Sequence, residues 1–172
     1  TETVFNALQP AIRFTKEECL DLPDIIYTTR DVPLTRQQDK YYKELKNRMV
    51  MEAAEETVTA ATAAVNMNKL LQISSGAVYR YKVLREVIDE SSKKVLIFVP
   101  FKHTITLLAE KLRKDKIPTE IISGAVKASD RTRIFKEFQE TDTPRVLVIQ
   151  PQAAAHGVTL TAANTIVWWG PT

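Results

Sequence analysis

Val95-Leu-Ile-Phe-Val99 is a continuous apolar run of β-forming residues, the pattern of a strand buried on both faces of a parallel sheet. A helical pattern follows it, with Ile105, Leu108 and Leu112 on one face. The next strand pattern is the short run Thr119-Glu-Ile-Ile122. From residue 94 onward, strand therefore alternates with helix.

The alternation continues through the rest of the chain. A helix is predicted over residues 129–140, with three apolar side chains turned inward: Ile134, Phe135 and Phe138. The last two strands are predicted at Arg145-Val-Leu-Val-Ile149 and Asn164-Thr-Ile-Val-Trp-Trp169. This βαβαβ order predicts an α/β fold with a parallel sheet and right-handed crossovers.

Residues 34–75 contain neither glycine nor proline, which predicts a long helix or a helical hairpin. Thr35-Arg-Gln-Gln38 has the pattern of a capping box, and apolar residues then recur at helical spacing at Tyr42, Leu45 and Met49. The Ala- and Thr-rich residues 53–65 fit either an exposed helical protrusion or a mobile connection.

Three weaker patterns flank this region. A further helix is predicted over residues 79–91, and Gly76 is placed to cap the helix before it. Near the N-terminus, residues 25–32 alternate weakly and are a candidate edge strand.

Composition sets broad limits on function. The 172 residues carry 24 basic and 21 acidic side chains, and the net charge of +3 is compatible with nucleic-acid contact without indicating it. The single Cys19 excludes an internal disulfide and suits a reducing, cytoplasmic setting. No run approaches the roughly 18 apolar residues of a membrane span, so we expect a soluble intracellular domain.

Chemistry is expected at the carboxyl ends of the strands, where open α/β sheets bind ligands. Gly124, Gly157 and Gly170 each follow a predicted strand, and His103 and His156 lie in strand-end segments. Ordinary strand-to-helix turns explain single glycines equally well. The sequence has no phosphate loop, no acidic pair at a strand end and no metal cluster, so it predicts neither a catalytic residue nor a metal site.

Five strings, in order, resemble the Swi/Snf-like helicase family of superfamily two. Leu8-Gln-Pro-Ala-Ile-Arg-Phe-Thr-Lys-Glu-Glu18 is similar to the segment that joins the two motor halves, and Val32-Pro-Leu-Thr-Arg-Gln-Gln38 to the next block. Lys94-Val-Leu-Ile-Phe-Val-Pro-Phe101 resembles motif IV, and Ile122-Ser-Gly-Ala125 resembles the following turn. Residues 146–167 resemble motif V, where a His-Gly pair is similar to the bacterial and bacteriophage branch.

Two departures from the family pattern stand out. Ala154 and Ala155 replace the paired glycines of motif V, and Thr159 replaces its Asn. The chain also ends at Thr172, before the arginine-bearing motif VI, and lacks the phosphate loop of the first motor half. The resemblance therefore implies a fragment that is inactive by itself.

The family fold implied is a RecA-like three-layer parallel sheet with helices on both faces and an inserted helical protrusion. Residues 1–23 are expected to be the interdomain linker and residues 24–172 the second RecA-like domain, with residues 35–90 mainly helical and 94–172 the α/β core. The function implied is the C-terminal motor domain of an ATP-dependent DNA translocase. The full-length motor would bind ATP and Mg²⁺, which this fragment alone would not. Its expected partners are DNA, gripped along the backbone of a duplex, and the first RecA-like domain, with no membrane and a cytoplasmic location, or the host cytoplasm for a viral protein.

The resemblance also implies three contacts to DNA phosphates and one to the nucleotide. The residues expected at DNA are Lys102, His103, Gly124, Lys127, Arg131, Gln150, Gln152 and Ala153, and those nearest ATP are His156 and Gly157. A solvated helix start or a plain turn explains several of them as well, and Gln150 and Gln152 could instead bond neighbouring loops. Trp168 and Trp169 fit core packing better than base stacking. Other readings left open are a strand-separating DNA or RNA helicase, a non-catalytic α/β module, and a nucleotide- or flavin-binding domain.

Overall fold

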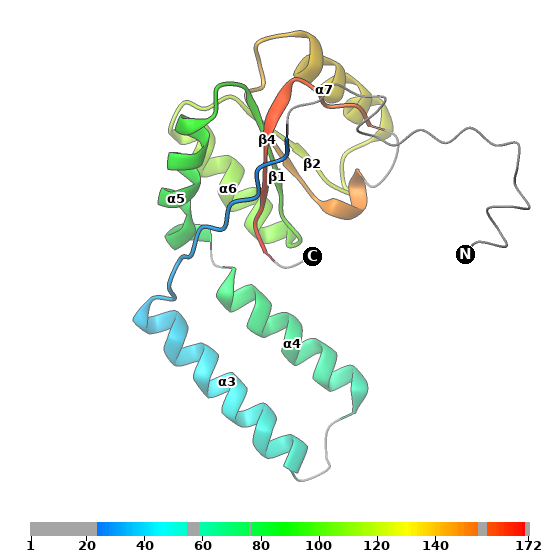
Figure 1. Ribbon diagram of the computed structural model, residues 1–172. Helices are drawn as coiled ribbons and strands as arrows, with labels where there is room; N and C mark the ends of the chain where they lie inside the picture. The colour runs from blue at the N-terminus through cyan, green and yellow to red at the C-terminus, as the bar shows by residue number, and fades with distance from the viewer. Residues whose placement is uncertain (1–23, 55–58, 76, 155–157, 171–172) are drawn as a thin grey trace, which may run out of the picture. The chain divides into compact units, whose positions relative to one another are not determined.

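The computed structural model describes residues 24–54, 59–75, 77–154 and 158–170 (Figure 1). The chain divides into two units, residues 1–31 and 32–172, and the predicted linker at residues 1–23 lies outside the described part. The edge strand predicted over residues 25–32 was wrong, because the described residues there are neither helix nor strand. Ile25, Ile26 and Tyr27 are consecutive, so a strand would point them to both faces instead of gathering them on one face that packs against a sheet. All three side chains are exposed in the structure.

The second unit contains a sheet of four parallel strands, as the alternation predicts. They are β1 (Lys94–Phe98), β2 (Thr119–Ile122), β3 (Val146–Ile149) and β4 (Ala163–Trp168). Their order across the sheet is β2-β3-β1-β4, so β3 and β1 are the central strands. All four side chains of β3 are buried, which agrees with its unbroken apolar sequence.

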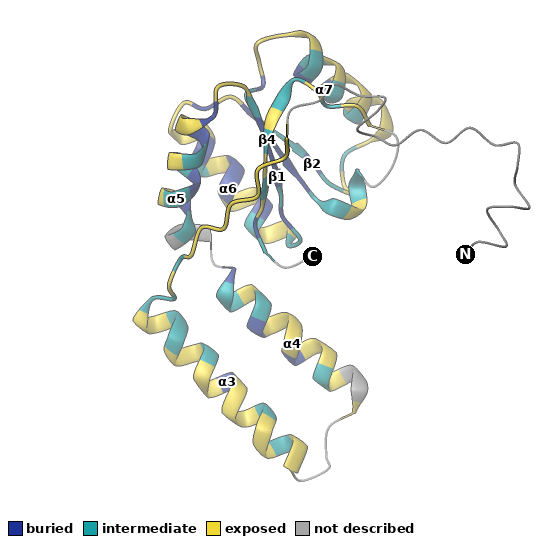
Figure 2. Cartoon of the chain, viewed as in Figure 1, coloured by how far each residue is buried: buried dark blue, intermediate teal, exposed yellow. Residues whose placement is uncertain are grey.

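Helices cover both faces of the sheet, and each face has its own apolar core (Figures 1 and 2). On one face α5 (Ala77–Glu90) and α6 (Lys102–Lys114) pack over Val95 and Ile97. On the other, α7 (Ala128–Glu140) places Phe138 over Leu96. Because successive side chains of a strand point to opposite faces, the run from Val95 to Phe98 supplies both cores. The three-layer architecture is confirmed.

The glycine- and proline-free region forms a hairpin of two helices, α3 (Arg36–Ala54) and α4 (Ala60–Ser74). The capping box is confirmed: Gln38 N–H donates to Thr35 Oγ1 at 3.2 Å, and Thr35 N–H donates to Gln38 Oε1 at 3.1 Å. The Gln38 amide also donates to the carbonyl of Ile73 at 2.9 Å, which ties the start of α3 to the end of α4.

Helix therefore continues through most of the Ala- and Thr-rich stretch, and residues 55–58 lie outside the described part. The expected cap at Gly76 also lies outside it. In the described residues, none of the helices combines the length and the apolar character that crossing a membrane requires.

Candidate nucleic-acid interface

The segments that follow three neighbouring strands lie at one edge of the sheet. Because β1, β2 and β3 are parallel and adjacent, their carboxyl ends lie side by side. The chain after β1 enters α6 at Lys102, the chain after β2 enters α7 at Ala128, and the chain after β3 forms the 3₁₀ turn η1 (Pro151–Ala153). The structure thus gathers at one edge the segments that carry the predicted DNA contacts.

Hydrogen bonds join the segments that follow β2 and β3. The backbone N–H of Gly124 donates to Gln150 Oε1 at 3.3 Å, and the backbone N–H of Gln150 donates to the Ile122 carbonyl at 2.8 Å. Two residues predicted for separate contacts, Gly124 and Gln150, are therefore one bonded pair. Gln150 is half-buried, so its side chain is held between the two strand ends.

Arg131 makes a second link between the same segments. Its Nε donates to the carbonyl of Val126 at 2.9 Å, and its Nη1 donates to the carbonyl of Ala153 at 3.3 Å. The guanidinium thus bridges the start of α7 and the end of η1, a role that sequence reasoning missed. A guanidinium has five N–H donors, so these two bonds leave others for an anion.

Both helices at this edge begin without a side-chain cap. The N-cap residues are Phe101 for α6 and Lys127 for α7, and neither side chain accepts a bond from the first turn. The first N–H groups of a helix have no partner within the helix and carry partial positive charge. With the exposed cations Lys102 and Lys127 beside them, these helix starts favour anions. His103 is also exposed, in the first turn of α6.

A groove of about 700 Å³ runs between α7 and the chain that follows β3. It brings together Arg131, Gln152 and Ala153, three of the predicted residues. It also includes polar and charged residues that the sequence reading did not select: Thr132, Lys136, Gln139, Glu140 and Thr159. Their signal was present in the sequence, because Thr132, Lys136 and Gln139 follow Ala128 at helical spacing and so share one face of α7.

His156 and Gly157, expected nearest ATP, lie outside the described residues. Within the described part of the chain, no three His, Cys, Asp or Glu side chains gather closely enough to hold a metal ion. The described residues of this edge offer N–H donors and cations for phosphate groups.

A parallel sheet with helices on both faces and loops gathered at its carboxyl edge is the fold of a RecA-like domain. Residues 79–172 match the family model described as the helicase conserved C-terminal domain. The match covers more than half of the chain, and the chain belongs to that family.

Two relatives and one solved structure resemble this chain in sequence or in fold. The chain is 26% identical over 92% of its length to an uncharacterized ATP-dependent helicase of Mycoplasma genitalium, of which it spans 17%. It is 30% identical over 56% of its length to the DNA annealing helicase and endonuclease ZRANB3 of Homo sapiens, of which it spans 9%. In structure it is similar to the C-terminal domain of the Sulfolobus solfataricus SWI2/SNF2 ATPase, with a TM-score of 0.71, 20% identity, and coverage of 80% of this chain and 68% of that one.

These likenesses confirm the Swi/Snf-like RecA-like domain that the five strings predict. They favour the helicase reading over a flavin-binding domain or a non-catalytic module. The bacterial or bacteriophage branch stays a prediction. Because the chain spans less than a fifth of either relative, the activity of the whole protein is a matter for proposal.

Proposed function

We propose that this chain is the second motor domain of an ATP-dependent DNA translocase, and that it grips the phosphodiester backbone of duplex DNA with the carboxyl edge of its sheet. One observation carries the proposal: two uncapped helix starts, each beside an exposed lysine, follow β1 and β2, the two strands that flank β3 in the sheet. The solved core of the Sulfolobus solfataricus SWI2/SNF2 ATPase with dsDNA, 21% identical and with a TM-score of 0.72 over 91% of this chain and 37% of that one, is consistent with the fold this requires.

Backbone gripping explains the chemistry of the edge. Contacts to phosphates need N–H groups, hydroxyls and cations, and they carry no base sequence. Lys102 with His103 would make one contact, and Gly124 with Lys127 a second. Gln152 and Ala153 would make the third, with Gln150 and Arg131 holding their segments together. A motor that moves along DNA needs this kind of sequence-tolerant grip.

ATP and Mg²⁺ enter the proposal through the longer protein. In that protein the first RecA-like domain would hold the metal and the phosphates. His156 and Gly157 would contribute one wall of the cleft. The single Cys19 supports a reducing compartment, the cytoplasm or the cytoplasm of a host.

The test is salt-dependent binding of a fluorescent duplex by the full chain. Replacing Lys102 or Lys127 with alanine should weaken binding similarly for unrelated duplex sequences. Each change should also lower the slope of log affinity against log salt by about 0.9, the value for one lost phosphate contact. Lys114→Ala is the matched control, because Lys114 is exposed at the opposite end of α6.

Two results would contradict the grip. One is a loss of affinity confined to a single duplex sequence, and the other is an equal loss in Lys114→Ala. Strand separation, the nearest alternative, is tested on the complete protein: unwinding of a forked duplex that matches the rate of ATP turnover would favour it over translocation on intact duplex.

A further inference from the structure

The helical hairpin leaves much of its apolar surface uncovered. Leu45 on α3, with Asn66 and Leu70 on α4, are the buried side chains among those the structure describes on the two helices. Large apolar side chains on the same helices lie exposed at Tyr41, Val50, Met51, Val65 and Met67. Exposed apolar surface of this extent is typical of a contact surface.

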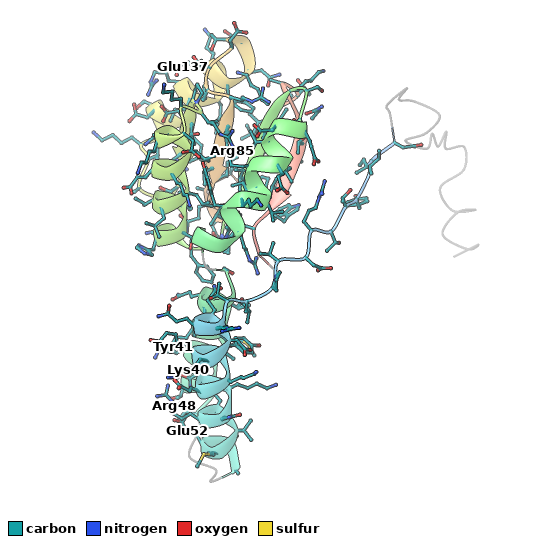
Figure 3. All side chains as sticks on the ribbon, turned by 90° about the vertical axis from the view of Figure 1, so that its left-hand side faces the viewer. Lys40, Tyr41, Arg48, Glu52, Arg85 and Glu137 are labelled. Atoms are coloured by element: carbon teal, nitrogen blue, oxygen red, sulfur yellow. The ribbon has the colours of Figure 1, made fainter. Side chains whose placement is uncertain are left out.

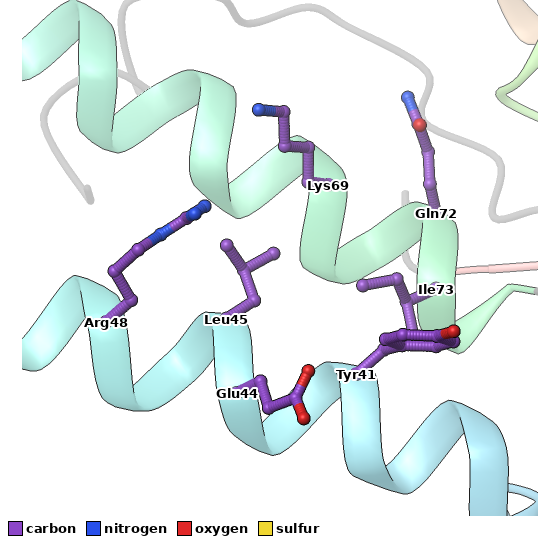
Figure 4. A pocket seen from close by; sticks show the side chains of 7 residues that line it. All are labelled: Tyr41, Glu44, Leu45, Arg48, Lys69, Gln72 and Ile73. Atoms are coloured by element: carbon purple, nitrogen blue, oxygen red, sulfur yellow. The ribbon is translucent and has the colours of Figure 1, made fainter.

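A groove lies between the two helices. It measures about 560 Å³ and is lined by four residues of α3 and three of α4 (Figure 4): Tyr41, Glu44, Leu45, Arg48, Lys69, Gln72 and Ile73. Its floor is apolar, because Leu45 is only 9% exposed and Ile73 is half-buried. Figure 4 shows the Tyr41 ring beside Ile73 at one end.

The charged side chains of the groove are mainly basic. Arg48 reaches from α3 toward α4, where Lys69 stands on the facing helix (Figure 4). Arg48 uses its Nε for an ion pair with Glu52 at 3.6 Å, one turn along α3 (Figure 3). Lys69 has no ion-pair partner among the residues that the structure describes. The one carboxylate in the groove lining belongs to Glu44. Its Oε1 lies 3.9 Å from Nζ of Lys40, which is outside the lining.

Apolar residues extend the groove beyond its two cations. Met51 follows Arg48 by three positions, and Val65 precedes Lys69 by four, so each shares a helix face with its cation. Both side chains are more than half exposed. The surface therefore runs from an apolar floor through two cations to a second apolar patch, which includes a methionine that adapts to varied shapes.

We propose that this groove docks an amphipathic, acidic helix of a partner protein. A channel between two packed helices accepts a third helix through apolar side chains spaced at i, i+3 or i+4, and i+7. Carboxylates on either side of that apolar stripe would meet Arg48 and Lys69. DNA fits the surface less well, because a phosphate backbone would leave the exposed apolar side chains of Tyr41 and Met51 uncovered. The inference is independent of the DNA grip, since the residues involved are on α3 and α4.

The probe is a fluorescent 18-residue peptide with leucines at helical spacing and glutamates flanking them, titrated with the full chain. The control peptide has the same sequence with lysine in place of every glutamate. We expect the acidic peptide to bind and the basic one to bind at least tenfold more weakly. Amide shifts in an NMR titration should fall on α3 and α4.

The double variant Arg48→Glu with Lys69→Glu should bind the acidic peptide about tenfold more weakly, or more weakly still. Its control, Lys43→Glu with Lys46→Glu, makes the same change of charge on exposed positions of α3 outside the groove lining. Circular dichroism shows whether each variant is folded. If the groove variant is unfolded, hydrogen exchange is measured on the unaltered chain with and without the acidic peptide. The proposal then requires that the peptide slow the exchange of amides on α3 and α4.

Four outcomes would overturn the proposal. They are no binding of the acidic peptide, equal binding of the two peptides, displacement of the peptide by duplex DNA with shifts on the same amides, and a concentration-dependent self-association that the groove variant abolishes. The last two would identify DNA or a second copy of the chain as the occupant.

Discussion

The indole Nε1 of Trp169 donates a 2.9 Å hydrogen bond to the carbonyl oxygen of Ser75, across 94 residues of sequence. Ser75 is the C-cap of α4, and Trp169 directly follows β4. The bond is buried, because Trp169 is 4% exposed. Arg80 adds a bond from its Nη1 to the Trp169 carbonyl at 2.9 Å, so the end of the helical hairpin is fastened to the end of a strand.

Trp169→Phe should destabilise the protein by about 1–3 kcal/mol, because it leaves the buried Ser75 carbonyl without its donor. Urea unfolding measures the effect. The matched control is Trp168→Phe, where the ring is 56% exposed and its stacking on Phe98 is kept, so a change within about 0.5 kcal/mol is expected. Equal losses in the two variants would show that the indole bond contributes nothing.

Ser75→Ala should stabilise the protein, the opposite of the effect of Trp169→Phe. The Ser75 hydroxyl is buried and has no hydrogen-bond partner within the described residues. Since a buried, unpartnered hydroxyl costs free energy, its removal should raise the free energy of unfolding by up to about 1–2 kcal/mol. The same urea titration decides the sign, and a clear loss of stability would mean that the hydroxyl has a partner.

Gln38→Glu should separate the two roles of Gln38. A carboxylate still accepts from the Thr35 N–H at the positive end of α3, so the capping box survives. It no longer donates to the Ile73 carbonyl and instead faces that oxygen, which should cost about 1–3 kcal/mol. Gln37→Glu places the same charge in the same turn, on an exposed side chain, and should be neutral or slightly stabilising. Thermal unfolding compares the pair.

Arg131→Lys tests whether charge or geometry matters at the sheet edge. Lysine keeps the charge but has no planar fork to reach the carbonyls of Val126 and Ala153 together. We expect Arg131→Lys to lose most of the affinity for duplex DNA that Arg131→Ala loses, with a salt slope unlike that of Arg131→Ala. Full binding by Arg131→Lys would mean that the residue acts through charge alone.

Lys94→Met should destabilise the protein by about 1 kcal/mol. The Lys94 ammonium donates to the carbonyl of Phe138 at 2.6 Å and to that of Thr141, and it lies 4.8 Å from the centre of the Phe138 ring. Because these carbonyls end α7, removing the cation leaves them without a donor. Lys93→Met, at an exposed neighbour, is the control and should change the unfolding midpoint little.

Several elements followed from local sequence because their signals are local. The run Val95-Leu-Ile-Phe-Val99 indicated β1, the spacing of Ile105, Leu108 and Leu112 indicated α6, and the Thr35 and Gln38 capping box indicated the start of α3. The candidate edge strand at residues 25–32 failed for a related reason. A segment becomes a strand only when it pairs with another strand, and weak alternation of apolar residues does not show that a pairing strand is present.

The sequence by itself determined the α/β class, the approximate bounds of most helices and strands, and the family through the order of its strings. Periodicity and capping act over a few residues, so they can be read from a single chain. Only the tertiary structure decided the strand order β2-β3-β1-β4 and the pairing of Gly124 with Gln150. It alone showed Arg131 bridging two segments and Trp169 bonded to Ser75. Those contacts join residues far apart in sequence, and their partners are set by how the whole core packs.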